Sequence, residues 1–256
     1  MLSYTGWHSW LKRVKKRLVL HVEALSIPCP NNNVQIVRKP RRAAGTENLR
    51  TADERPMVTT LPNDVFLPFA PDKPWLAPLA GWSDLPFRLL CRRFGAAVCC
   101  TEMISAKGLI YKSPGTAELF ATCPEDGPVV VQLFGSEAPF MEAAAGQLRD
   151  KGFVWFDCNM GCSVPKVART GSGAAMCKDI DNALAVAEAL IRAAGRGRVG
   201  FKLRLGWDEP GRSPAAETWR VLAPALEALG AGWLTLHPAR RSRASPGRRA
   251  GNISAS

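Results

Sequence analysis

The chain has 256 residues, of which 46% are hydrophobic and 22% are charged, a composition typical of a soluble globular protein with a sizeable core. Its eight cysteines include no C-x-x-C pair and it has three histidines, so we find no zinc-ligand spacing and predict no metal site. No apolar run approaches the roughly 18 residues of a membrane-spanning helix, and no secretory signal precedes the cysteines, which favours reduced thiols in the cytoplasm.

The formal net charge of +12 lies almost entirely in the two ends of the chain. Residues 1–70 hold 11 Lys and Arg against 5 Asp and Glu, and residues 237–256 hold 5 Arg and no acid. Residues 71–236 hold 18 basic and 17 acidic side chains. The basic composition is therefore weak evidence that the folded part binds RNA, because the excess charge lies outside it.

The composition divides the chain into three parts. Residues 1–70 form a basic extension that we expect to be poorly ordered, although its cluster at 12–20 could also form an amphipathic helix at a membrane surface or an RNA-binding arm. Residues 71–237 form the folded part. Residues 238–256 are rich in Arg and Ser and have one aliphatic side chain larger than alanine, so we expect this tail to be disordered.

Short apolar runs alternate with helical patterns within the folded part. The first helix starts with Ser83 or Asp84 as its cap, has Pro86 in its first turn and ends before Gly95. We predict strands at residues 75–80, 96–101, 128–134, 153–158, 199–205 and 232–236, and further helices at residues 136–150, 179–194 and 215–229.

Strands that alternate with helices pair in parallel, so the alternatives are a closed barrel and an open doubly wound sheet. No G-x-G-x-x-G follows the first strand, which argues against a dinucleotide-binding sheet. Polar residues recur instead at the carboxyl ends of the strands, which in a barrel all lie on one face. The sequence therefore predicts an α/β fold, a TIM (β/α)8 barrel, with these residues at its mouth: Glu102, Gln132, Asn159, Cys162, Lys202, Arg204 and His237.

One cysteine stands in a loop suited to chemistry. The segment from Asp157 to Lys166 places Cys162 after Gly161, just beyond an apolar strand, where a turn can present a side chain to a cleft. A cysteine thiol is mostly protonated at neutral pH and can serve as a general acid. The alternative is a small residue that is buried and inert in a tight turn.

Five blocks of sequence, taken together, resemble the tRNA-dihydrouridine synthases in order and spacing, and they look like those of a bacterial member. The blocks are residues 76–88, 101–107, 131–135, 159–173 and 201–207, and the resemblance covers about residues 74–237. It implies a barrel of the FMN-linked oxidoreductase type that acts on tRNA in the cytoplasm, and we expect a monomer.

The resemblance also implies a reaction and its residues. FMN, reduced by NADPH or NADH, passes a hydride to C6 of a uracil in tRNA, and Cys162 protonates C5. The residues implied in holding FMN are Pro78, Leu79, Ala80, Gln132, Lys202 and His237. Those implied in binding the uracil and the tRNA are Asn159, Glu102, Lys166 and Arg204, with Lys107 and Arg169 as further candidates.

Each of these side chains also has an ordinary explanation. Amides at strand ends often satisfy backbone groups, and basic residues at alternate positions are often solvated surface charges.

Three departures from the family pattern bear on activity. Ser163 replaces a proline after the cysteine, which removes a restriction on φ. After His237 the family's His-x-Arg motif, barrel strands 7 and 8 and a helical tRNA-binding domain do not follow, which we interpret as a reading-frame shift or a truncated gene product. The extension at residues 1–70 has no counterpart. We therefore expect a barrel truncated after about six strands, weak FMN binding and poor reduction of tRNA.

Two other functions remain open at this stage. One is a small-molecule FMN-dependent oxidoreductase of the dihydroorotate dehydrogenase type, in which tRNA would not affect reoxidation of the flavin. The other is a catalytically inactive, truncated RNA-binding remnant, which would bind tRNA with a steep salt dependence and lose no activity on Cys162→Ala.

Overall fold

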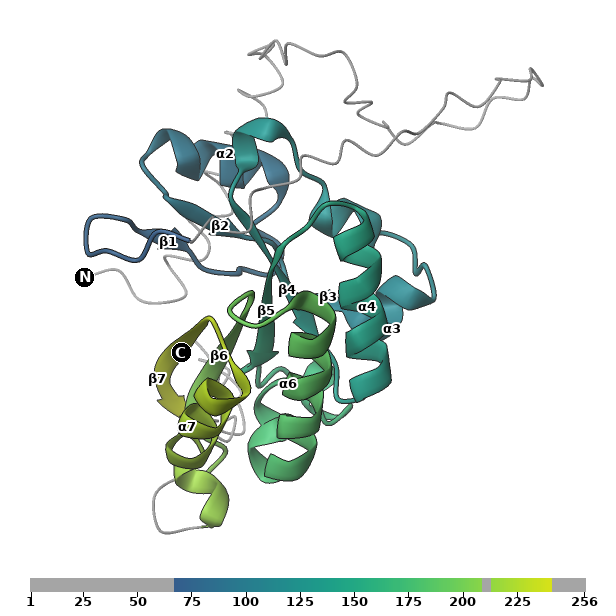
Figure 1. Ribbon diagram of the computed structural model, residues 1–256, viewed down its shortest axis with the longest axis vertical. Helices are drawn as coiled ribbons and strands as arrows, with labels where there is room; N and C mark the ends of the chain where they lie inside the picture. Colours follow the sequence, from purple (N-terminus) through teal and green to yellow (C-terminus); the bar gives the residue numbers. More distant parts are fainter. Residues whose placement is uncertain (1–66, 209–212, 241–256) are drawn as a thin grey trace, which may run out of the picture. The chain divides into compact units, whose positions relative to one another are not determined.

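The computed structural model describes residues 67–208 and 213–240, and Figure 1 shows how their helices and strands are arranged. The predictions for residues 1–66 and for the tail from residue 241 onward lie outside this part of the chain. Among the helices that the structure describes, none combines the length and the apolar character needed to cross a bilayer.

Seven strands form one parallel sheet in the order β1-β2-β4-β5-β6-β7, and the short β3 pairs with β4. The strands are β1 (Trp75–Leu76), β2 (Val98–Cys100), β3 (Ile104–Ser105), β4 (Val129–Phe134), β5 (Trp155–Met160), β6 (Val199–Gly206) and β7 (Trp233–Arg240). All six predicted strands are present. The sequence does not predict β3, because a two-residue strand has no readable alternation.

β1 and β7 differ most in extent from the prediction. β1 ends at Leu76 rather than Ala80, because the chain turns where the N–H groups of Trp82 and Ser83 both donate to the Leu79 carbonyl at 2.9 Å. β7 continues to Arg240 and stays paired with β6 there, so residues 238–240, which the sequence assigns to the tail, end a strand.

Three of the α-helices begin after a residue whose side chain caps the helix. The α-helices are α2 (Leu85–Arg93), α3 (Ala106–Ile110), α4 (Ala138–Asp150), α5 (Pro165–Ala168), α6 (Ile180–Ala194) and α7 (Trp219–Leu229), and the 3-10 helices are Ala117–Phe120, Pro124–Asp126, Gly173–Lys178 and Pro214–Glu217. Asp84 caps α2 by accepting from the Phe87 N–H at 3.2 Å, and Asp179 caps α6 by accepting from the Asn182 N–H at 3.0 Å. The last predicted helix begins later than residue 215, because a 3-10 turn precedes it.

One face of the sheet packs against helices and forms the main core. Phe156, Leu133 and Phe201 are fully buried in it together with residues of α4, α6 and α7, and Figure 1 shows α4 and α6 side by side. α2 covers the same face, since the Cys99 thiol lies 3.8 Å from the Arg88 carbonyl. A doubly wound sheet has helices on both faces, whereas a barrel has them on one. The predicted fold, a (β/α)8 barrel with about six of its strands, is therefore confirmed.

The opposite face, which we call the inner face, has an apolar floor near the amino ends of the strands. The floor consists of Val98, Cys100, Val130 and Trp155, with Trp75 and Trp233 packed against them. The Trp233 ring lies 5.6 Å from that of Trp75 and 6.3 Å from that of Trp155. Trp233 occupies the space beside Gly200, where a Cβ would come within 1.9 Å of the indole. Because successive side chains alternate between faces, the inner face continues above this floor with polar residues.

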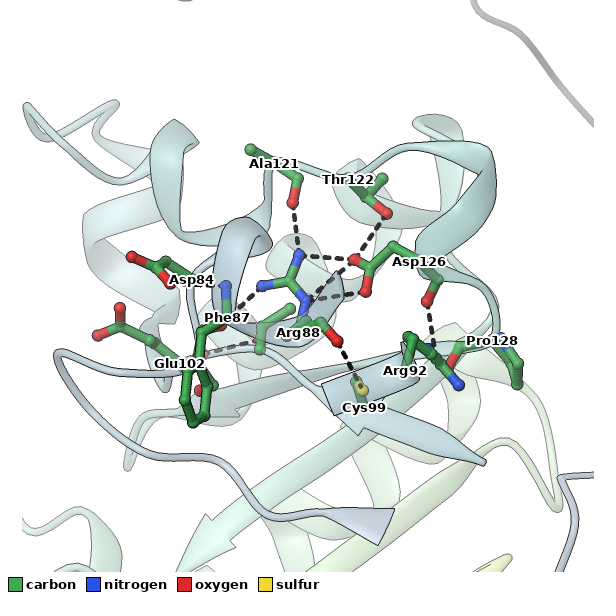
Figure 2. A network of polar contacts seen from close by, with 12 residues as sticks. Asp84, Phe87, Arg88, Arg92, Cys99, Glu102, Ala121, Thr122, Asp126 and Pro128 are labelled. Atoms are coloured by element: carbon green, nitrogen blue, oxygen red, sulfur yellow. Dashed lines mark hydrogen bonds and ion pairs between the residues drawn. The ribbon is translucent and has the colours of Figure 1, made fainter. Parts of the chain in front are cut away.

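A buried ion pair fixes α2 to the loop that leads into β4. Arg88 and Asp126 are both fully buried, and the guanidinium donates to the carboxylate at 2.7 Å and 2.9 Å. Figure 2 shows Arg88 pointing into this loop, where it also donates to the Ala121 carbonyl at 2.6 Å, while the Thr122 hydroxyl donates to Asp126 at 3.1 Å. The buried guanidinium and carboxylate thus have hydrogen-bond partners, without which a buried charge would be strongly destabilising.

We predict that Asp126→Ala lowers the free energy of unfolding by about 3–5 kcal/mol, because it leaves the Arg88 guanidinium buried without its counter-charge. Urea unfolding at pH 7 measures the change. Glu142→Ala is the matched control, since it removes the exposed ion pair with Arg192, whose bonds are 3.0 Å long, and should change stability little. An equal effect of the two substitutions would contradict the assignment.

Candidate functional site

Cys162 lies in a turn that the Asn159 side chain holds. Asn159 is at the end of β5, and its Oδ1 accepts from the backbone N–H groups of Gly161 at 3.1 Å and of Cys162 at 2.9 Å. An Asn side chain that bonds the backbone two or three residues on replaces a backbone turn. The Cys162 side chain is half-buried, unlike the buried Cys158 in the preceding strand. The turn therefore leaves Cys162 partly accessible, and its role as an acid stays a prediction.

The far side of this turn requires a glycine. The Ala174 N–H donates to the Cys162 carbonyl at 2.9 Å, so the segment after Ser172 runs against the Cys162 backbone. Gly173 has a φ of +62°, and a Cβ there would come within 2.5 Å of the Cys162 carbonyl oxygen. Gly173 therefore allows the segment after Ser172 to lie directly against the Cys162 backbone.

Gln132 and Asp157 extend the contacts of Asn159 across the inner face. The Asn159 Nδ2 donates to the Gln132 Oε1 at 2.9 Å, and the Gln132 Nε2 donates to the Asp157 Oδ2 at 2.6 Å. The backbone N–H of Gln132 donates to the Thr101 hydroxyl at 3.1 Å. All four side chains are buried, so the bonds form in a low-dielectric surrounding where an unpaired group would be costly.

The burial of Asp157 changes its acid–base behaviour. Loss of hydration raises the pKa of this carboxyl to about 6, and the Gln132 amide, the Lys202 charge and the Trp233 indole, which act in the opposite direction, offset only part of the rise. The pKa of the Lys202 ammonium is lowered, mainly by its own burial and despite the attraction of Asp157. The two groups lie on neighbouring strands, and each affects the pKa of the other through its charge.

Basic side chains gather at the carboxyl ends of β6 and β7. Strand pairing sets Lys202 opposite Asn159 and Arg204 opposite His237. The Arg204 guanidinium donates to the Gly161 carbonyl, so it also supports the turn that carries the cysteine. The pKa of His237 is lowered by burial and by the charges of Lys202 and Arg204. These three residues form a set of hydrogen-bond donors suited to an anionic or carbonyl-bearing ligand.

The loop after β1 is joined to the end of β2. The Gly81 N–H donates to the Glu102 carboxylate, and the Ser83 hydroxyl accepts from the Leu79 N–H at 3.0 Å. Leu79 is 43% exposed and Pro78 is half-buried, so the segment from Pro78 to Ala80 presents backbone and an apolar side chain outward.

The structure thus brings together most of the predicted site residues. Gln132, Asn159, Cys162, Lys202, Arg204 and His237 come from adjacent strands, and Glu102 lies beyond Thr101 at the same end of the sheet. Lys166 is exposed on α5, and no hydrogen bond or ion pair within the described ranges joins it to this group. Lys107 is also exposed and pairs with Glu137. The roles of all these residues in binding remain predictions.

Asp157 and Thr101 are not among the site residues predicted from the sequence. The available signal is the alternation in β5, where Asp157 and Asn159 share a face of a strand that otherwise contains apolar residues and Cys158. Its meaning depends on the register that places Asp157 opposite Gln132. As for metals, residues 67–208 and 213–240 contain no group of three or more His, Cys, Asp and Glu side chains that could hold an ion.

The model of the dihydrouridine synthase (Dus) family matches residues 75–254. The chain belongs to this family. The match begins where the resemblance in the sequence begins and continues to residue 254, past the predicted end at residue 237. The predicted membership of the dihydrouridine synthase family is confirmed, because the match covers more than half of the chain.

Two curated relatives of this Dus chain come from bacteria. It is 38% identical over 175 residues to a "Probable tRNA-dihydrouridine synthase" of Rhizobium leguminosarum bv. phaseoli, which covers 68% of the chain and 52% of the relative. It is 39% identical over 163 residues to a protein of the same description from Rhodobacter capsulatus, which covers 63% of the chain and 48% of that protein. The chain spans about half the length of the curated relatives that it matches.

A solved structure, the "Crystal structure of TcOYE with pHBA", is similar at a TM-score of 0.46 and 12% identity, over 66% of this chain and 72% of that one. A likeness at this level supports no statement about function.

The shifted pKa of Asp157 predicts a pH dependence of stability. Its pKa is about 6 in the folded protein against an ordinary 3.8, so between these values the folded protein keeps a proton that the unfolded chain has lost. Stability therefore falls as the pH rises through this window, by about 3 kcal/mol in total. Urea unfolding from pH 4 to pH 7 should show this fall in the wild type relative to Asp157→Asn, which has no carboxyl at this position. Parallel pH profiles of the two proteins would show the prediction to be wrong.

Proposed function

We propose that the chain catalyses the reduction of uridine in tRNA to 5,6-dihydrouridine. Membership of the dihydrouridine synthase family supports the reaction, and relatives described as probable tRNA-dihydrouridine synthases support tRNA as the substrate. The observation that carries the proposal is the half-buried Cys162, held by Asn159 at the carboxyl end of the sheet beside the cluster of polar side chains. A thiol in this position can deliver a proton to a ligand that lies over the strand ends.

The residues at the strand ends fit FMN as the cofactor. Lys202 and His237 are donors on neighbouring strands, Lys202 is partly buried, and the amide of Gln132 keeps a second N–H because Asp157 takes only one. Donors of this kind suit a flavin, whose ring edge carries carbonyl groups and whose phosphate is anionic. The backbone at Pro78 to Ala80 offers an outward surface for the flat ring. FMN, when bound and reduced by NADPH or NADH, supplies the hydride that adds to C6 of the uracil.

The chain's own residues then complete the reduction. Cys162 holds a proton on its sulfur, and this proton moves to C5 of the uracil as the hydride adds to C6, so the C5–C6 double bond becomes a single bond and charge balances. The thiolate that remains takes a proton from water. Asn159 keeps the thiol in place through the backbone bond at 2.9 Å, and Arg204 supports the same turn from β6.

The tRNA has to present its uracil to this site. A uracil in folded tRNA is stacked, so it must leave the stack before its C5 and C6 atoms can reach the strand ends, at a cost of a few kcal/mol. We assign Glu102 and Arg204 to the uracil or its sugar, and Lys166 to the tRNA backbone, where an exposed ammonium can neutralise phosphate. The seven cysteines that the structure describes are free, which supports action in the cytoplasm.

The test is formation of dihydrouridine by the full chain with FMN, NADPH and unmodified tRNA. We expect Cys162→Ala to lower the rate of product formation about 10²–10⁴-fold, the usual contribution of a general acid, while FMN binding is retained. Cys123→Ala is the matched control, because Cys123 is also half-buried but lies in the loop before β4, and the rate should not change.

A second protein, in which the C-terminal half of the Rhizobium leguminosarum relative follows residue 237, is measured in parallel. Absence of dihydrouridine from both proteins, with FMN bound, would overturn the proposal. Flavin reoxidation that is indifferent to tRNA would point instead to a small-molecule oxidoreductase.

A further inference from the structure

A continuous series of hydrogen bonds runs from a buried carboxylate to the backbone of the cysteine turn. It starts at the Asp157 Oδ2, which accepts from the Gln132 Nε2 at 2.6 Å. The Gln132 Oε1 accepts from the Asn159 Nδ2 at 2.9 Å, and the Asn159 Oδ1 accepts from the N–H groups of Gly161 and Cys162. Each amide side chain in the series therefore accepts at its oxygen and donates from its nitrogen.

Asp157, at the start of this series, determines which atom of each hydrogen bond is the donor and which is the acceptor. An amide side chain can be turned end for end, which exchanges its donor and its acceptor while its shape stays almost the same. An ionised carboxylate can only accept, so Gln132 must turn its nitrogen toward Asp157 and its oxygen toward Asn159. Asn159 must then turn its nitrogen toward Gln132, which leaves its oxygen for the two backbone N–H groups. Reversal of Asn159 would set its nitrogen against the N–H groups of the Cys162 turn, and reversal of Gln132 alone would set its nitrogen against that of Asn159.

We propose that Asp157 is a positioning residue, whose carboxylate fixes the orientation of the Gln132 and Asn159 amides and thereby the turn that presents Cys162. Its importance for catalysis rests on the proposed function, but its effect on the turn does not. Asp157 is connected to the Cys162 backbone through the side-chain amides of Gln132 and Asn159.

Packing alone does not explain a carboxylate at this position. Asp157 is 3% exposed, and burial of a charge is costly unless donors surround it. Its donors are the Gln132 amide and the Trp233 indole N–H, with the Lys202 charge nearby. The indole belongs to the apolar floor of the inner face, so Asp157 connects this layer to the amides above it. An asparagine of the same shape would satisfy the space but would not determine which way Gln132 turns.

The test uses the full chain at pH 7.5 without cofactor, where the Asp157 carboxyl is ionised, and measures hydrogen exchange at the Gly161 and Cys162 amides. Asp157→Asn should speed exchange at these two amides about tenfold or more, the factor that corresponds to about 1.4 kcal/mol. The control amide is that of Cys158, which lies inside β5 and should exchange at the wild-type rate.

A double variant tests whether the sense of the bonds is what matters. In Asp157→Asn with Gln132→Glu, the new carboxylate is at position 132 and accepts from both the new amide and the Asn159 Nδ2, so the orientation of Asn159 is restored with the same net charge. We expect exchange at Gly161 and Cys162 to return to within about threefold of the wild type. In the proposed reaction, Asp157→Asn should lower kcat for tRNA reduction and leave KM for tRNA unchanged.

Three results would overturn the inference: unchanged exchange in Asp157→Asn, faster exchange at Cys158 as well, or failure of the double variant to slow the exchange. The exchange measurement does not depend on activity. Loss of the proposed function through an inactive wild type would therefore be recognised separately from failure of this inference.

Discussion

The register of parallel pairing among β4, β5 and β6 is the constraint on which the site depends. It sets Gln132 opposite Asp157 and Asn159 opposite Lys202, so four polar side chains from three strands meet on one face of the sheet. A shift of one residue in any of these strands would turn its polar residues toward the helices and its apolar residues toward the inner face. The apolar core on the helix side, which includes Leu133, Phe156 and Phe201, therefore also fixes the position of the chemistry.

The inner face combines an apolar layer with a layer of buried polar side chains. The floor of tryptophan and aliphatic side chains excludes water from below, and the polar layer above it must then satisfy its own hydrogen bonds. Asp157 shows the cost of this arrangement, since its pKa rises to about 6 even with two donors beside it. The same low dielectric strengthens the hydrogen bonds that orient Asn159, whose side chain holds the turn at Cys162.

The rim of the sheet is held by a different device. The buried pair of Arg88 and Asp126 joins α2 to the loop before β4, and Glu102 joins the loop after β1 to the end of β2. Each contact joins two neighbouring β/α units (Figure 2). Without such contacts, these units would be held together only by the hydrogen bonds between their parallel strands. The segment from Pro78 to Ala80 is thereby held at the same end of the sheet as the polar cluster.

The sequence by itself determined the order of six strands and four helices, the start of the first helix at Ser83 or Asp84, and the family, because these depend on local patterns and on blocks such as residues 159–173. It also identified Asn159 and Cys162, which lie in one such block. The tertiary structure alone decided that β1 stops at Leu76, that residues 214–217 turn before α7, and that Asp157 faces Gln132. Those features depend on hydrogen bonds and register between residues far apart in the chain, and no local pattern encodes them.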